Sequence, residues 1–107
     1  MGAVPSIRDR ATFAALRRDG VRRRSGPVSV TAIAGDDQRA RVAYALPRSV
    51  GNAVMRNRIR RRLREAVRAV DVAPGAYLIS ASPPAADLSF DALVEHVRQA
   101  TGQAHGR

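Results

Sequence analysis

The chain has 107 residues and a formal net charge of +10, because nineteen basic residues face nine acidic ones. This length fits one domain, and the charge indicates a polyanionic partner, with nucleic acid ahead of an anionic membrane surface. The absence of cysteine excludes disulfides, cysteine-based zinc sites and thiolate catalysis. No apolar run approaches the ~20 residues of a membrane span, and the N-terminus lacks the apolar core of a signal peptide. We therefore expect a cytoplasmic protein.

The first part of the chain predicts a short helix followed by strands. Residues 11–18 have helical spacing, and Thr12 is a candidate N-cap. Further on, apolar residues alternate with polar ones, which is typical of strands with one buried face. The expected strands are 27–34 and 39–46, with 21–24 as a candidate for a further short strand.

A turn separates the two clear strands. Gly35, Asp36 and Asp37 lie between them, and this composition predicts an antiparallel hairpin. The two aspartates are also candidate magnesium ligands, but a tight turn accounts for them more simply.

The second part of the chain predicts helix, strand and helix. Asn52 is a candidate N-cap for a long helix that ends near Asp71. Residues 76–82 form an apolar strand, expected to be a parallel neighbour of strand 39–46 because a helix connects the two. Ser89 is a candidate cap for the last helix. Its predicted core residues are Phe90, Leu93, Val94 and Val97.

The long helix is unusually rich in arginine. Seven of the thirteen residues from Arg56 to Arg68 are arginine, against twelve in the other ninety-four. Like charges four residues apart oppose an isolated helix by a few tenths of a kcal/mol each, and only Glu65 interrupts the run. We therefore expect the compensating charge on a partner. The apolar residues keep helical spacing and predict one buried stripe: Met55, Ile59, Leu63, Ala66, Val67 and Val70.

Residues 48–65 read RSVGNAVMRNRIRRRLRE. This segment closely resembles the signature of the bacterial ribonuclease P protein family, in which a basic residue and a Gly-x-Ala-Val loop precede an Arg-Asn-Arg helix with further basic residues. Weaker similarity extends to Phe13, to Gly20, to the two strands after them and to the last strand and helix. Two positions depart from the family pattern: Ser49 replaces a second basic residue, and Arg17 replaces a second aromatic.

The resemblance implies an α+β fold, a small single-domain α/β sandwich. Its element order is α-β-β-(β)-α-β-α. Its β-α-β crossover is left-handed, which is an exception to the usual right-handed rule. In similar proteins the Arg-Asn-Arg helix and its preceding loop contact a large catalytic RNA. A separate cleft between the central sheet and that helix holds the single-stranded 5′ leader of precursor tRNA. The RNA carries out hydrolysis with bound Mg²⁺, and the protein raises substrate affinity.

The implied function is that of an RNA-binding subunit of an endoribonuclease whose chemistry belongs to its RNA. The implied partners are the catalytic RNA and precursor tRNA, with no membrane and no obligate protein partner. Mg²⁺ is expected to be held mainly by RNA, and metal ligands on the chain are not predicted. The predicted RNA-binding residues are Arg48, Asn52, Arg56, Asn57, Arg58, Arg60, Arg61, Arg62, Arg64 and Arg68. The predicted leader-binding residues are Phe13, Arg17, Arg22, Arg23, Arg24, Val28, Val30 and Arg41.

Three other functions stay open at this point, of which a DNA-compacting protein is disfavoured because the apolar stripe ties the arginine helix to a core and limits wrapping. A structural or ribosomal-type RNA-binding protein would share the basic helix but would not need a leader cleft. A protein-only nuclease would need convergent acid and base groups, and neither His96 nor His105 has a suitable neighbour in the sequence, so no catalytic residue is predicted. We expect one domain over residues 1–107, with residues 1–6 and 102–107 disordered.

Overall fold

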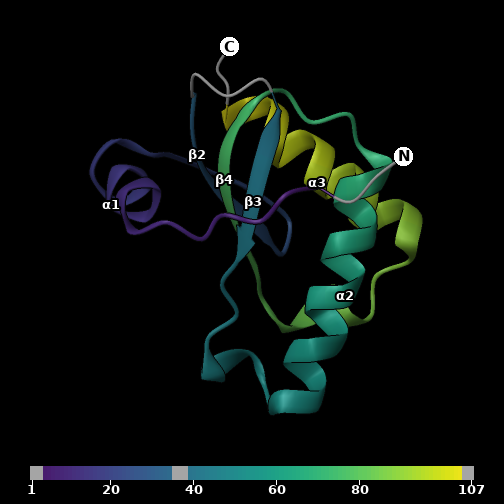
Figure 1. Ribbon diagram of the computed structural model, residues 1–107. Helices are drawn as coiled ribbons and strands as arrows, with labels where there is room; N and C mark the ends of the chain where they lie inside the picture. The colour runs from purple at the N-terminus through teal and green to yellow at the C-terminus, as the bar shows by residue number, and fades with distance from the viewer. Residues whose placement is uncertain (1–3, 35–38, 105–107) are drawn as a thin grey trace.

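In a computed structural model the chain forms a four-stranded sheet with helices on both faces (Figure 1). The structure describes residues 4–34 and 39–104, and side chains as far as residue 102. The elements are α1 (Arg10–Asp19), β1 (Val21–Ser25), β2 (Val28–Ile33), β3 (Ala40–Tyr44), the 3-10 turn η1 (Arg48–Val50), α2 (Ala53–Ala69), β4 (Gly75–Ala81), the 3-10 turn η2 (Pro83–Ala86) and α3 (Phe90–Ala104). The predicted α+β class and element order are confirmed, including the candidate strand at 21–24.

The strand order is β1-β2-β4-β3, so β4 lies between the two strands that the sequence predicts to form a hairpin. β4 pairs antiparallel with β2 and parallel with β3. The predicted parallel pair is therefore confirmed, and the predicted β2–β3 hairpin is wrong. The reason is that β4 is apolar and mostly buried, which suits a central strand, whereas the charged β1 suits an edge. The turn predicted at residues 35–37 lies outside the described residues.

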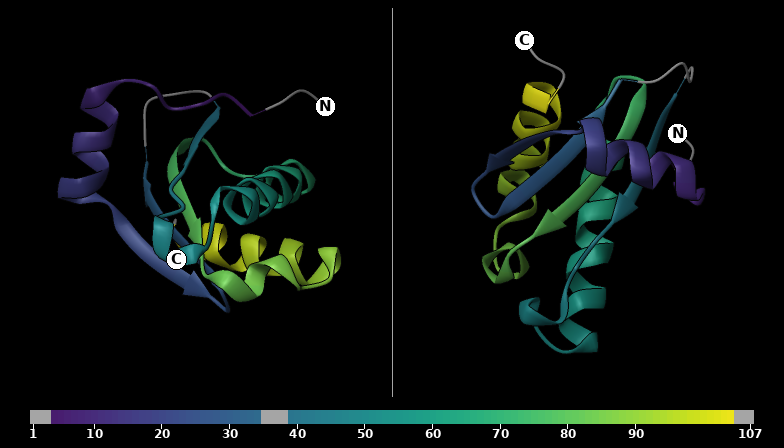
Figure 2. Two further views of the ribbon diagram at one scale, coloured as in Figure 1. Left: turned by 90° about the horizontal axis from the view of Figure 1, so that it is seen from below. Right: turned by 90° about the vertical axis from the view of Figure 1, so that its left-hand side faces the viewer.

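β3, α2 and β4 form the expected left-handed crossover. In the right-hand view of Figure 2, α2 lies behind the sheet, both strands run downward, and β4 lies to the left of β3. α1 packs on β2 and β4 from one face of the sheet, whereas α3 packs on β1, β2 and α2 from the other. Successive residues of each central strand therefore point to different helices.

The main hydrophobic core lies between the sheet and the pair α2 and α3. Val30, Tyr77 and Ile79 of the sheet pack in one buried cluster with residues such as Ile59 and Leu93 of the helices. A smaller cluster lies under α1 and contains Ile7, Leu16 and Ala76. Leu93 and Val97 are buried as predicted, but Phe90 is 42% exposed, because it occupies the first turn of α3, and its assignment to the core is wrong.

The N-terminal segment pairs with the outer edge of β3. The N–H of Val42 donates to the carbonyl oxygen of Pro5 at 2.9 Å, and the N–H of Ile7 donates to that of Val42 at 3.2 Å. At the other end, α3 continues to Ala104. The structure thus describes residues 4–6 beside β3 and residues 102–104 in α3. The disorder expected for 1–6 and 102–107 stays a prediction, and the remaining residues of both segments lie outside the described residues.

The N-cap of α1 is Asp9, and the predicted cap, Thr12, is wrong. Asp9 Oδ2 accepts hydrogen bonds from the Thr12 N–H at 2.9 Å and from the Thr12 hydroxyl at 2.6 Å. Asp9 Oδ1 also accepts from Arg41 on β3 at 3.1 Å. One carboxylate thus begins α1 and ties it to the edge strand.

Candidate nucleic-acid interface

The N-terminus of α2 is fixed by two local features. Asn52 Oδ1 accepts a hydrogen bond from the Met55 N–H at 2.9 Å, which confirms the predicted N-cap. Gly51 has a φ of +153°, and a Cβ there would lie 2.9 Å from Met55 Cγ, so glycine is required. The buried stripe through Ile59 and Leu63 then sets the rotation of the helix, and with it the directions of the arginines.

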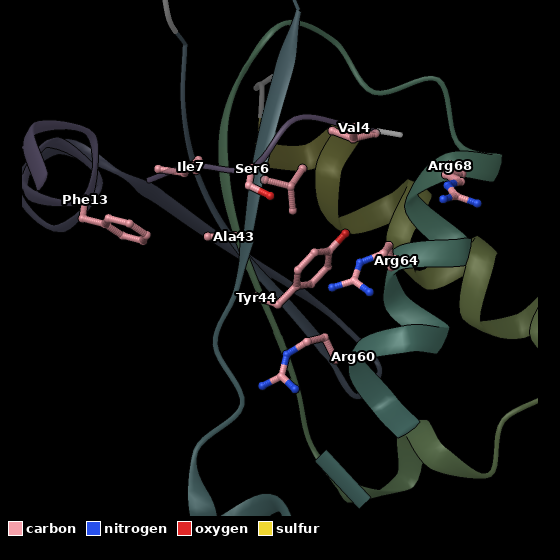
Figure 3. A pocket seen from close by; sticks show the side chains of 10 residues that line it. Val4, Ser6, Ile7, Phe13, Ala43, Tyr44, Arg60, Arg64 and Arg68 are labelled. Atoms are coloured by element: carbon pink, nitrogen blue, oxygen red, sulfur yellow. The ribbon is translucent and has the colours of Figure 1, made fainter. Parts of the chain in front are cut away.

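One flank of α2 faces β3. Arg60, Arg64 and Arg68 line a hollow against this edge strand, together with Tyr44. The guanidinium carbon of Arg64 lies 5.8 Å from the centroid of the Tyr44 ring. Figure 3 shows the two side chains beside one another. Arg60 Nη1 donates to Asn57 Oδ1 at 2.7 Å, so Asn57 orients a neighbouring arginine.

The opposite flank faces η2. Arg58 Nη2 donates to the carbonyl oxygen of Ala86 at 3.4 Å, and Arg62 Nη2 donates to that of Leu88. Arg62 is half-buried, and its Nε has no hydrogen-bond partner within the described part of the chain. These two predicted RNA-binding residues hold η2 and the loop after it against α2, whereas Arg61 between them is exposed.

The positive charge of α2 is largely uncompensated within the chain. Arg68 lies 3.7 Å from Glu65, and it is the one arginine of this helix with an ion pair in the described ranges. Arg56 Nη1 donates to the carbonyl oxygen of Gly51 at 3.2 Å. An extended cationic surface without matching acids is the arrangement expected of a protein that binds phosphates.

Two grooves flank this surface. The edge groove, about 500 Å³, crosses the outer edge of β3 beneath the N-terminal segment and includes Phe13, Ala43, Tyr44, Arg60, Arg64 and Arg68. The sheet-face groove, about 450 Å³, lies on the α1 side of the sheet and includes Arg22, Ser29, Thr31, Pro47, Leu78 and Ser80. An adjoining hollow of about 260 Å³ shares Arg22, Ser29, Pro47 and Ser80 and extends the sheet-face groove to Arg24.

The predicted leader-binding residues do not come together as one site. Phe13 lines the edge groove, Arg22 and Arg24 line the sheet-face groove and its extension, and Arg17 and Arg23 are exposed. Arg41 donates to Asp9 and, at 3.1 Å, to the hydroxyl of Thr12.

Val28 and Val30 are fully buried. They point into the core with α2 and α3, so their assignment to a leader surface is wrong. The adjacent residues of β2, Ser29 and Thr31, have side chains on the other face of the sheet and line the sheet-face groove instead. Strand alternation could have selected them, since the face of β2 that the core does not use is the accessible one.

Tyr44 is the residue that sequence reasoning missed. It shares a face of β3 with the buried Val42 and so is predicted to lie in the core, but it is only half-buried and also lines the edge groove. Burial raises the pKa of Tyr44 above its ordinary value, with a smaller opposing effect of Arg64 and Arg68. The hydroxyl therefore stays protonated at neutral pH and keeps a hydrogen to donate.

The described residues form no cluster of metal-binding side chains. No group of three histidine, cysteine, aspartate or glutamate side chains that could hold a metal occurs in residues 4–34 and 39–102. His96 Nδ1 lies 2.9 Å from the hydroxyl of Ser25, at the turn between β1 and β2. In these same ranges no helix is both long and apolar enough to cross a membrane.

The family model Ribonuclease P matches residues 1–105. The ribonuclease P protein component of a Nocardioides species is 39% identical over 105 residues, which cover 92% of this chain and 90% of the relative. That of a Roseiflexus species, strain RS-1, is 35% identical over 102 residues, covering 92% and 84%.

Solved structures with a similar fold include two ribonuclease P proteins. The one from Staphylococcus aureus has a TM-score of 0.75 at 20% identity and covers 92% of this chain and 95% of its own. The one from Thermotoga maritima has a TM-score of 0.76 at 17% identity, covering 88% and 92%. At these identities the likeness establishes the fold.

Proposed function

The chain belongs to the ribonuclease P protein family, and we propose that its interface with the ribonuclease P RNA is the exposed arginine surface of α2 together with the η1 loop. As a ribonuclease P protein component, it is a subunit of an endoribonuclease that processes the 5′ end of tRNA. RNA binding follows from this membership. The residues that make the contacts are our proposal.

The observation that carries the proposal is the uncompensated charge on a rigid helix. Arg56, Arg60, Arg61 and Arg64 have no acidic partner in the described part of the chain, and the buried stripe of α2 holds their backbone against the core. The exposed Arg48 of η1 extends this surface beyond the N-terminus of the helix. Arg58 and Arg62 contribute less directly, since each donates to a backbone carbonyl of the segment that follows β4 and so holds that segment against α2.

We propose that the sheet-face groove receives the leader of precursor tRNA. Arg22 lines it, and Arg24 lines its extension. The hydroxyls of Ser29, Thr31 and Ser80 on its floor can donate to and accept from phosphates and riboses without reading sequence. A groove that continues past Pro47 toward η1 would bring the leader close to the RNA-binding surface.

The contribution of this chain is binding and orientation. Mg²⁺, proposed to be held by RNA, supplies metal-assisted activation of water and of the phosphate. The arginines neutralise phosphates that would otherwise repel each other where two RNAs meet. Less Mg²⁺ is then needed to hold the substrate on the ribozyme.

The test is cleavage of precursor tRNA at low Mg²⁺ by the RNA subunit alone, by the protein alone and by both together. We expect cleavage by the mixture, and its loss when Arg60, Arg61 and Arg64 are all changed to Ala. Arg98→Ala is the matched control, because Arg98 is exposed on α3 and pairs with Glu95 at 2.8 Å. Tight RNA binding without any stimulation of cleavage would instead favour a structural RNA-binding protein, and cleavage by protein alone would favour a nuclease.

A further inference from the structure

The edge groove has a composition that phosphate neutralisation alone does not require. Two aromatic side chains, Phe13 and Tyr44, lie in it with three arginines of α2. In Figure 3, Tyr44 and Arg64 point toward one another across the hollow, and Arg60 lies below them. A volume of about 500 Å³ is within the usual range for a small-molecule site. A solvated basic face would need neither the ring nor the hollow.

The Tyr44 ring can accept a flat, electron-rich partner. Tyr44 is half-buried and packs against the main core cluster, which limits the movement of its ring before any ligand arrives. Arg64 is exposed and has no ion pair in the described ranges, so its guanidinium can move to cover a bound base. Stacking of bases on aromatic rings and on arginine planes is the usual way in which unpaired nucleotides are held.

The backbone at this edge adds hydrogen-bonding groups. Val42 uses its N–H and carbonyl to pair with Pro5 and Ile7. Because peptide groups alternate in direction along a strand, those of Tyr44 point to the same outer edge, just beyond the N-terminal segment. The protonated hydroxyl of Tyr44 is a further donor. A base beside the ring could therefore accept hydrogen bonds from the N–H and the hydroxyl of Tyr44 and donate one to its carbonyl oxygen.

We propose that the edge groove is a binding site for a single unpaired nucleotide of RNA, with its base stacked on Tyr44 and its phosphates held by Arg60 and Arg64. This site is separate from the sheet-face groove proposed for the leader, because the two grooves share no lining residue. The nucleotide comes either from the ribonuclease P RNA or from precursor tRNA. The recognition chemistry is the same for both RNAs. The identity of these two RNAs rests on the proposed function, whereas the nucleotide site itself does not.

The first test uses a single-stranded RNA pentamer that carries 2-aminopurine, a base whose fluorescence falls on stacking. Tyr44→Leu fills similar apolar space without a ring, so it should bind about five- to 150-fold more weakly and should not quench the fluorophore. Tyr44→Phe keeps the ring and should stay within about twofold of wild type in affinity. Phe90→Leu removes an exposed aromatic of α3, outside the groove, and should change nothing. Thermal unfolding confirms that each variant is folded.

Two results of this test would overturn the proposal. The first is wild-type affinity and quenching in Tyr44→Leu. The second is an equal loss in Tyr44→Phe, since the hydroxyl and not the ring would then be responsible. Because the pentamer contains neither partner RNA, these results do not depend on whether the protein stimulates cleavage.

A second test identifies the source of the nucleotide. The affinity of Tyr44→Leu is measured for the ribonuclease P RNA, and that of its holoenzyme for precursor tRNA with and without a leader. A loss confined to the RNA subunit, or one confined to leader-bearing substrate, assigns the nucleotide to that molecule. Wild-type affinity in every arm would refute a role for the groove in the holoenzyme.

Discussion

Arg58 Nη2 lies 3.4 Å from the carbonyl oxygen of Ala86 and donates a hydrogen bond to it. One turn further along α2, Arg62 does the same to Leu88. The chain between η2 and α3 is thus attached to α2 by guanidinium groups from the middle of the most basic segment. Arginines that look equivalent in the sequence therefore divide into those that hold the fold and those that are available to a partner.

Arg62→Ala should lower the free energy of unfolding by about 1.5–3 kcal/mol, the range for a lost hydrogen bond from a charged donor. The neighbouring Arg61→Ala should leave stability within about 0.5 kcal/mol of wild type, because Arg61 is exposed, while weakening RNA binding. Urea unfolding and an RNA-binding titration on both variants check this. Equal stability of the two variants would mean that the Leu88 contact does not hold the loop.

Asn52 combines two predicted roles, and its variants can separate them. Asn52→Ala removes the acceptor for the Met55 N–H and should cost about 1 kcal/mol of stability. Asn52→Asp keeps a capping oxygen but places a negative charge beside the proposed RNA-binding surface. It should therefore fold like wild type and bind RNA more weakly. If Asn52→Asp binds RNA normally, the residue is a cap alone.

Local sequence patterns predicted most of the elements and the rotation of α2, because helix caps and apolar periodicity depend on neighbouring residues. They did not predict that β4 lies between β2 and β3, since strand order depends on which strand buries both faces. Val28 and Val30 were placed on the wrong face for a similar reason: periodicity identifies two faces of a strand but not which helix covers each. Tyr44 was missed because its exposure depends on how α2 packs beside an edge strand.

Asp9, the N-cap of α1, should make the free energy of unfolding depend on pH. Hydrogen bonds from Thr12, and then from Arg41, lower the pKa of Asp9 from 3.8 to about 2. Because the folded pKa lies below the unfolded one, the charged carboxylate stabilises the fold. This contribution is fully present above pH ~4 and is lost as pH falls through ~2. Asp9→Asn should therefore be less stable than wild type at pH 6, with the difference shrinking between pH 4 and 2.

Urea unfolding across this pH range measures the difference, and a carbon-13 NMR titration of the Asp9 carboxyl gives its pKa directly. Thr12→Val is a second variant that removes one donor and should raise that pKa toward 3.8. A constant gap between wild type and Asp9→Asn from pH 6 to pH 2 would show that the carboxylate charge does not contribute.

The arginines of α2 that have no acidic partner in the described ranges should determine how steeply RNA affinity falls with salt. Each neutralised phosphate contributes about 0.7 (single strand) to 0.9 (duplex) to the slope of log affinity against log salt. Arg60→Ala and Arg64→Ala should each reduce that slope by roughly this amount for the ribonuclease P RNA. Arg98→Ala, on α3 and paired with Glu95, should leave it unchanged, and so should Arg62→Ala if the guanidinium serves only Leu88. A slope reduced equally by all four variants would instead indicate a diffuse response to net charge, in which the direction of each side chain on α2 does not matter.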